Sequence, residues 1–257
     1  MDDKENIFDK IREITGKGKE QLNILEEQIN IALQVEYFEY TKNVKQKINK
    51  KSILNRKDKL FDPEYTNGRK KKLLCQLASI DDVSAYRAIE GYIGVAAESL
   101  KDWAVLALQE SRMLLESSLL DESQIFISTG LGGKGNKLRY FIVVFSEDLK
   151  QFNAIQEKII RNEFDFMFGK SDEILEDLAF HGNFVTFTVL VSIHKSVQQI
   201  FEGAITECNQ YGNFIKNNFV ITNVKRLSKE EITTFIEKND FEPDDEDLII
   251  DQGFVSE

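Results

Sequence analysis

A glycine- and lysine-rich turn between two apolar runs holds the residue types best suited to contact an anion. The turn reads Thr129-Gly-Leu-Gly-Gly-Lys-Gly-Asn136 and separates the apolar runs 125–129 and 138–145. Glycine lets backbone amides approach a ligand closely, and lysine and arginine add the positive charge that phosphate attracts. The candidate residues for contact with an anion or a partner are Gly130, Gly132, Gly133, Lys134, Gly135, Lys137 and Arg139.

This turn does not match a nucleotide-binding motif. No Ser or Thr follows either lysine to hold magnesium, and the turn leads into a predicted strand, whereas a Walker A loop leads into a helix. The dinucleotide pattern GxGxxG is absent as well. We therefore predict no cofactor. The alternative to anion contact is a flexible, exposed hairpin tip, whose glycines adopt positive φ angles and whose lysines keep it soluble.

A second cationic feature lies nearer the N-terminus, where residues 42–72 contain twelve basic and three acidic residues. Such a segment could lie along RNA or DNA, because each neutralised phosphate releases counterions. The candidate contact residues are Lys45, Lys47, Lys50, Lys51, Arg56, Lys70, Lys71 and Lys72.

Two observations weigh against a dedicated nucleic-acid binder. The whole chain is acidic, with a net charge of -11 and a pI of about 4.9, and the nearest aromatic residues for base stacking are Phe61 and Tyr65. The segment could instead be a solvated helix face, or it could pair with the C-terminal part of the chain, where residues 229–257 hold eleven acidic and two basic residues.

Residues for catalysis and metal binding are scarce. His181 and His194 are the only histidines, and neither lies in a recognisable nucleophile motif. Cys75 and Cys208 are far apart in the sequence, and we expect both to be buried thiols of the core. No cluster of cysteine and histidine and no calcium-binding loop is present, so no metal site is predicted. The sequence therefore favours a protein that is not an enzyme.

The composition predicts a folded protein with one or two domains, since 42% of its 257 residues are hydrophobic and 11% are aromatic. No apolar run approaches the ~18 residues of a membrane span, and the acidic residues of the start do not resemble a signal peptide. We expect a cytoplasmic protein without a membrane span.

The pattern along the chain predicts an α+β fold, in which a helical N-terminal region precedes an α/β sandwich with a mixed or antiparallel four-stranded sheet. We expect helices on one face of that sheet. The predicted divisions are N-terminal helices with the basic segment (1–60), a helical hairpin (61–120), an α+β sheet domain (121–240) and an acidic tail (241–257).

Several elements are specific enough to test. Apolar spacing predicts a helix from Lys19 to about Ile48 and a short helix over 171–180. Alternation over 184–193 predicts a strand with one buried face. The sequence Ser228-Lys-Glu-Glu231 predicts a capping box before a last helix.

Three hypotheses about function follow. The leading one is a cytoplasmic interaction or adaptor protein that docks on a larger assembly through a protein partner. The second is an RNA- or ribosome-associated factor that uses the basic segment and the glycine-rich hairpin. The third, less favoured, is an enzyme acting on a phosphorylated substrate at the glycine turn. Homo-oligomerisation is left open.

Overall fold

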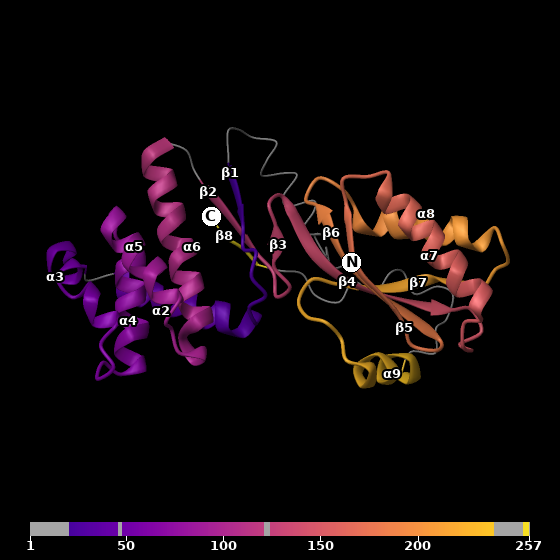
Figure 1. Cartoon of the computed structure of the whole chain (residues 1–257), viewed down its shortest axis with the longest axis horizontal. Helices are drawn as coiled ribbons and strands as arrows, with labels where there is room; N and C mark the ends of the chain where they lie inside the picture. The colour runs from indigo at the N-terminus through magenta and orange to yellow at the C-terminus, as the bar shows by residue number, and fades with distance from the viewer. Residues whose placement is uncertain (1–20, 46–47, 121–123, 239–253, 257) are drawn as a thin grey trace, which may run out of the picture. The chain divides into compact units, whose positions relative to one another are not determined.

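The computed structural model describes residues 21–45, 48–120, 124–238 and 254–256. The chain divides into two compact units, a helical unit within residues 18–126 and a sheet unit within residues 127–255 (Figure 1). None of the helices in these ranges combines the length and apolar character needed to cross a membrane. The first twenty residues of the predicted N-terminal helical region (1–60) and most of the acidic tail (241–257) lie outside the described residues.

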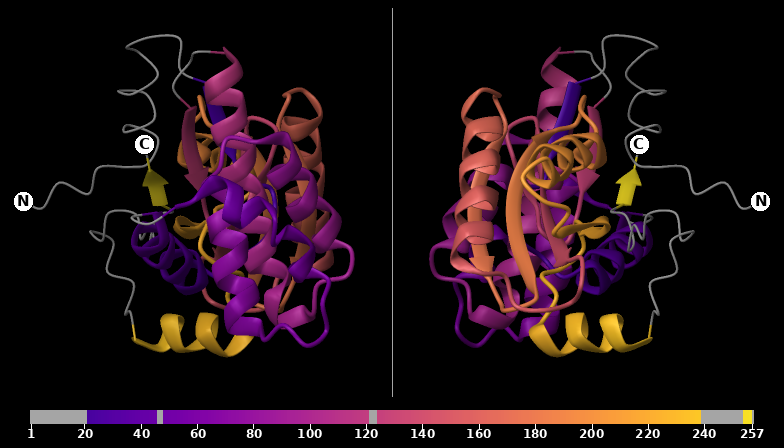
Figure 2. Two further views of the ribbon diagram at one scale, coloured as in Figure 1. Left: turned by 90° about the vertical axis from the view of Figure 1, so that its left-hand side faces the viewer. Right: turned by 90° about the vertical axis from the view of Figure 1, so that its right-hand side faces the viewer.

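The helical unit, coloured indigo to magenta in Figure 2, packs around one tryptophan. Trp103 is 1% exposed and meets the ring of Tyr37 edge-on, with 5.1 Å between the ring centroids. After strand β1 (Gln21–Ile24), the elements are α2 (Ile31–Lys45), α3 (Lys50–Leu54), the 3-10 helix η1 (Lys57–Leu60), α4 (Asn67–Ala78), α5 (Val83–Ile93) and α6 (Glu98–Leu120).

The sheet unit is built on an antiparallel sheet with β4 at its centre. β4 pairs with β6 along one edge, and β5 is the outer neighbour of β6. Along its other edge, β4 pairs with β3 through its first residues and with β7 farther along. These strands are β3 (Gly133–Lys134), β4 (Lys137–Ser146), β5 (Ile174–Phe180), β6 (Phe184–Ser192) and β7 (Ile215–Thr222). A separate three-stranded sheet joins β1, β2 (Gln124–Ser128) and β8 (Phe254–Ser256).

Helices cover both faces of the large sheet. On one face, α7 (Ala154–Gly169) and α8 (Val197–Asn209) bury an aromatic cluster that includes Phe164, Phe187 and Phe201. On the other, α9 (Lys229–Lys238) places Ile232 against the strand residues of a smaller core. Our expectation that helices cover only one face of the sheet was therefore wrong. The expectation that β6 buries only one face was also wrong, because Thr188, on its other face, is only 1% exposed.

The α+β class and the order of a helical region followed by a sheet are confirmed, but within the described residues the sheet has five strands instead of the predicted four, because β3 and β5 pair into it and β2 pairs in the separate sheet. The Ser228 capping box is also confirmed: the Ser228 hydroxyl accepts from the amide of Glu231 at 3.2 Å, and the Glu231 carboxylate accepts from the amide of Ser228 at 2.9 Å. This capping box stabilises the start of the helix, because each side chain accepts a hydrogen bond from a backbone amide that has no carbonyl partner within the helix.

Two element predictions were wrong. Residues 174–180 form β5 rather than a helix, because β6 supplies antiparallel partners along that segment. The first long helix begins at Ile31 instead of Lys19, since residues 21–24 form β1 and the side chain of Asn30 accepts from the amide of Ala32 at 2.8 Å. In both places, strand pairing across the chain overrides a local helical pattern.

Candidate functional site

The glycine-rich turn is built into the sheet unit. Residues 130–133 are buried, and exposure is confined to Lys134, Gly135 and Asn136 at the tip between β3 and β4. A Cβ atom at Gly130 would lie 1.7 Å from the carbonyl oxygen of Val224, so only glycine fits there. At the tip, Gly135 has a φ of 60°, as a two-residue hairpin requires.

The other groups of this turn are bonded within the sheet unit. The amide of Leu131 donates to the carbonyl oxygen of Asn223 at 2.9 Å, and the amide of Arg139 donates to that of Gly132 at 3.0 Å. Gly132, like Gly133, is buried, and its φ of 67° lies in the left-handed region. These amides take part in the fold of the turn itself.

Two of the three cations of the turn have acidic partners at β5 or just before it. Arg139 donates to both carboxylate oxygens of Glu176, at 2.6 and 3.0 Å, and Lys137 lies 3.1 Å from Asp172. The side chains of Lys137 and Arg139 are only 14% and 13% exposed. The structure therefore brings the predicted residues of the turn together, while leaving Lys134 as its exposed cation.

The basic segment of the helical unit is spread over several elements. Lys45 lies 2.7 Å from Glu110, and Lys50 lies 3.4 Å from Asp82. Lys51 is exposed on α3, and Lys47 lies outside the described residues.

Within α4, Lys70 and Lys71 contact neighbours of the same unit. The ammonium of Lys71 lies 3.1 Å from Glu36 and 4.1 Å from the ring centroid of Trp103, and that of Lys70 lies 5.6 Å from the ring centroid of Tyr92. These two predicted contact residues thus serve the packing of the helical unit.

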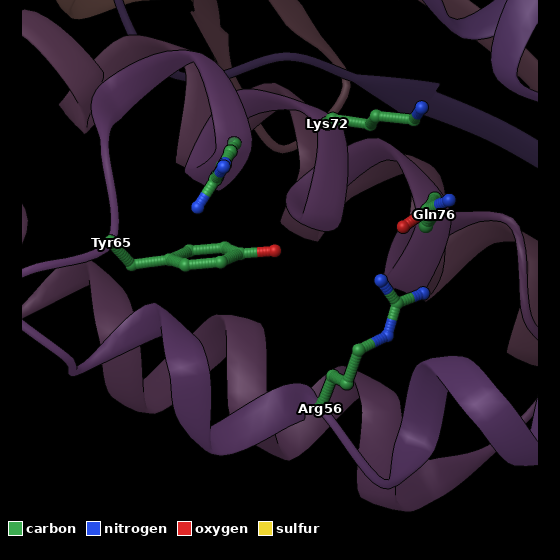
Figure 3. Close-up of a pocket in the computed structure, with 5 residues that line it drawn as sticks. Arg56, Tyr65, Lys72 and Gln76 are labelled. Atoms are coloured by element: carbon green, nitrogen blue, oxygen red, sulfur yellow. The ribbon is translucent and has the colours of Figure 1, made fainter.

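Two further predicted residues, Arg56 and Lys72, meet at a pocket of about 280 Å³ (Figure 3). Arg56 stands between α3 and η1, and Tyr65 lies in the loop before α4. The other lining residues, Arg69, Lys72 and Gln76, occupy positions i, i+3 and i+7 of α4, so they share one face of that helix. α4 buries the apolar residues Leu73, Leu74 and Leu77 in the core of the helical unit, so its polar face is left toward solvent.

The pocket is shaped by contacts among its own residues. The Nε of Arg56 donates to the carbonyl oxygen of Ser52 at 3.1 Å, which leaves its two terminal nitrogens for a ligand. The guanidinium of Arg69 lies 5.9 Å from the ring centroid of Tyr65. In Figure 3, the Tyr65 hydroxyl and the Arg56 guanidinium point toward one space, and the carboxamide of Gln76 borders that space with its oxygen on the near side.

The electrostatics of the pocket favour an anion. No carboxylate lines it, and among the described residues Arg56, Arg69 and Lys72 have no acidic partner within 4.0 Å. Arg69 also stands in the first turn of α4, which carries no acidic residue. The positive end of the helix dipole lies there, so a cation in that turn is unfavourable until an anion binds. We take this cationic pocket as the candidate functional site.

Three of its residues, Tyr65, Arg69 and Gln76, were absent from the predicted site residues. The spacing 69, 72 and 76 was a usable signal, because it places two cations and an amide on one helix face. The packing of the helical unit brings Arg56 and Tyr65 next to this face of α4. Local sequence does not encode that packing, so it could not be predicted.

Other reactive groups offer little chemistry. A ring nitrogen of His181 lies 3.0 Å from the hydroxyl of Thr186. Burial raises the pKa of the Cys75 thiol to about 11 and that of Cys208 to about 12. Within the ranges that the structure describes, no group of three or more histidine, cysteine, aspartate or glutamate residues is placed to hold a metal ion.

Comparison with known proteins gives little guidance. No protein-family model matches the chain, and no curated protein matches it. Among solved structures, the chain is similar to a crystal structure described as a "putative transposase" from Deinococcus radiodurans R1, with 13% identity and a TM-score of 0.35. That likeness covers 41% of this chain and 93% of the other. At this level of similarity, it carries no argument about function.

Proposed function

We propose that this chain is an RNA-binding interaction protein, which contacts an RNA phosphate group through the cationic pocket of its helical unit. The observation that supports the proposal most is that Arg56, Arg69 and Lys72 all line one pocket and have no acidic partner among the described residues. Bringing three positive charges together costs free energy through repulsion, which an anionic ligand reverses. Phosphate is the anion that guanidinium groups match best, because they donate two parallel hydrogen bonds.

The acidity of the whole chain does not oppose this proposal. Positive and negative charges are concentrated in different segments of the sequence, with basic residues in 42–72 and acidic residues beyond 229. Charge density near the contact governs the attraction of RNA, since exposed charges farther away than about 8 to 10 Å are screened by salt. A basic patch can therefore bind RNA within an acidic protein.

The adaptor hypothesis has less support. No described contact identifies a surface for a protein partner, whereas the pocket specifies a class of ligand by its charge. The RNA hypothesis is therefore the one developed further.

Fluorescence anisotropy with a labelled single-stranded RNA of about 12 nucleotides tests the proposal. The double variant Arg56→Gln/Arg69→Gln removes two charges and keeps polar side chains, and we expect its Kd to rise at least tenfold, since a charge-assisted hydrogen bond is worth about 1.5 to 3 kcal/mol. Arg112→Gln is the matched control, because Arg112 is an exposed arginine of α6 that does not line the pocket. Equal Kd values for wild type and the double variant would refute the proposal.

A further inference from the structure

We infer that the cationic pocket recognises a terminal phosphate monoester of an RNA strand, at its 5′ or its 3′ end, rather than a phosphodiester within the strand. This inference rests on the proposed function and adds the part of the RNA that the pocket holds. It follows from the shape of the pocket, its donors and its charge.

The shape favours an end of the strand. The lining residues come from the α3–η1 junction, the loop before α4 and one face of α4, and the pocket that they form is open to solvent. An internal phosphodiester carries a nucleoside on both sides, and its binding site needs an entrance and an exit for the strand. A terminal phosphate carries one ester bond and can enter from a single side.

The size of the pocket also favours the end of an RNA strand. Pockets for ligands of drug size span roughly 300 to 1,000 Å³, and this one is about 280 Å³. That space suits a phosphate with its sugar, and it is too small for several nucleotides. The rest of the strand would run over the surface outside the pocket.

The hydrogen-bonding groups match a monoester. All the lining side chains can donate: two guanidinium groups, an ammonium, the Tyr65 hydroxyl and the Gln76 amide. A monoester presents three oxygens and a charge of about -1.5 to -2 at neutral pH. A phosphodiester presents two such oxygens and a single charge. The three cations, which have no acidic partner within the part of the chain that the structure describes, therefore match the monoester more closely.

The arginines are also partly ordered before a ligand binds. Arg56 is held by Ser52, and Arg69 is held over the ring of Tyr65. Ordering a long side chain on binding costs about 0.5 to 1.5 kcal/mol, so a pocket that has already met part of this cost binds more tightly.

The test compares three RNAs of one sequence, about 12 nucleotides long and labelled internally. One carries a 5′-monophosphate, one a 3′-monophosphate, and one a hydroxyl at both ends. We expect one of the phosphorylated RNAs to bind at least tenfold more tightly than the hydroxyl form, as one added charge-assisted hydrogen bond predicts, and that preference identifies the end. Arg56→Gln and Arg69→Gln should reduce the preference below about twofold, whereas Arg112→Gln should keep it, with circular dichroism verifying the fold of each variant.

The outcomes separate this inference from the proposed function. Equal binding of the three RNAs, with the pocket variants weakening all of them alike, would overturn the inference and leave the proposed function standing. If none of the RNAs binds, the proposed function fails and this inference fails with it.

Discussion

Replacing the buried Gly130 by alanine should destabilise the sheet unit more than the same change at Gly135, the exposed glycine at the tip of the turn. The new Cβ would lie 1.7 Å from the oxygen and 2.6 Å from the carbon of the Val224 carbonyl. Both distances are far below van der Waals contact, and the obstacle is backbone rather than the end of a flexible side chain. The turn would have to move away and lose the hydrogen bond from Leu131 to Asn223.

The magnitude follows from these contacts. Overpacking a well-packed site costs about 1 to 3 kcal/mol, and a clash with backbone places Gly130→Ala near the upper end, at about 3 kcal/mol. Gly135→Ala is the matched control, because nothing lies within 4 Å of a Cβ there and only its φ of 60° is unfavourable. A left-handed alanine costs about 1 to 2 kcal/mol.

Urea unfolding followed by far-ultraviolet circular dichroism measures both variants, with the free energy obtained by linear extrapolation. Trp103 is the sole tryptophan and belongs to the helical unit, so its fluorescence reports on that unit separately. If Gly130→Ala lost no more stability than Gly135→Ala, the close approach to Val224 would not be what requires glycine in this turn.

Four further predictions concern buried, paired and helix-capping groups. Iodoacetamide at pH 8 should label Cys75 and Cys208 slowly in the native protein and fully in urea, because both thiols are buried. Mass spectrometry counts the labelled cysteines, and rapid labelling of the native protein would contradict their burial. Because burial raises both thiol pKa values above 9.0, the unfolded chain releases these protons first, and the free energy of unfolding should fall as the pH rises above about 9. Arg139→Gln, which loses both hydrogen bonds to Glu176, should cost about 2 kcal/mol in urea unfolding, and a change within about 0.5 kcal/mol would show that the pair contributes little. Asp82→Ala removes the cap of α5 and should cost about 1 kcal/mol at pH 7; because capping lowers the pKa of Asp82 below 3.8, its contribution should vanish as the pH falls through the folded value.

The sequence predicted those features whose causes are local. The capping box at Ser228 depends on residues three apart, and the strand at 184–192 depends on alternation, so both could be identified before the structure. The covering of both faces of that strand could not, because it depends on where α9 packs. The segment 174–180 shows the same limit, since its hydrogen-bond partners lie in β6.

The candidate site was only partly predictable for a related reason. Charge counting singled out the segment 42–72, and Arg56 and Lys72 within it, as contact residues. It could not tell that Lys50 and Lys71 have acidic partners inside the helical unit. Nor could it tell that Tyr65 would reach the same pocket, because a loop and a helix face meet there through tertiary packing.

The salt dependence of RNA binding tests the central claim most directly. For single-stranded nucleic acid, the logarithm of the binding constant falls with the logarithm of salt concentration with a slope of about -0.7 per neutralised phosphate charge. If the pocket cations neutralise one phosphate with a charge of about -1.5 to -2, the triple variant Arg56→Gln/Arg69→Gln/Lys72→Gln should flatten the wild-type slope by about 1 to 1.4, while Arg112→Gln leaves it unchanged. A triple variant that keeps the wild-type slope would contradict the claim that this pocket binds the phosphate of RNA.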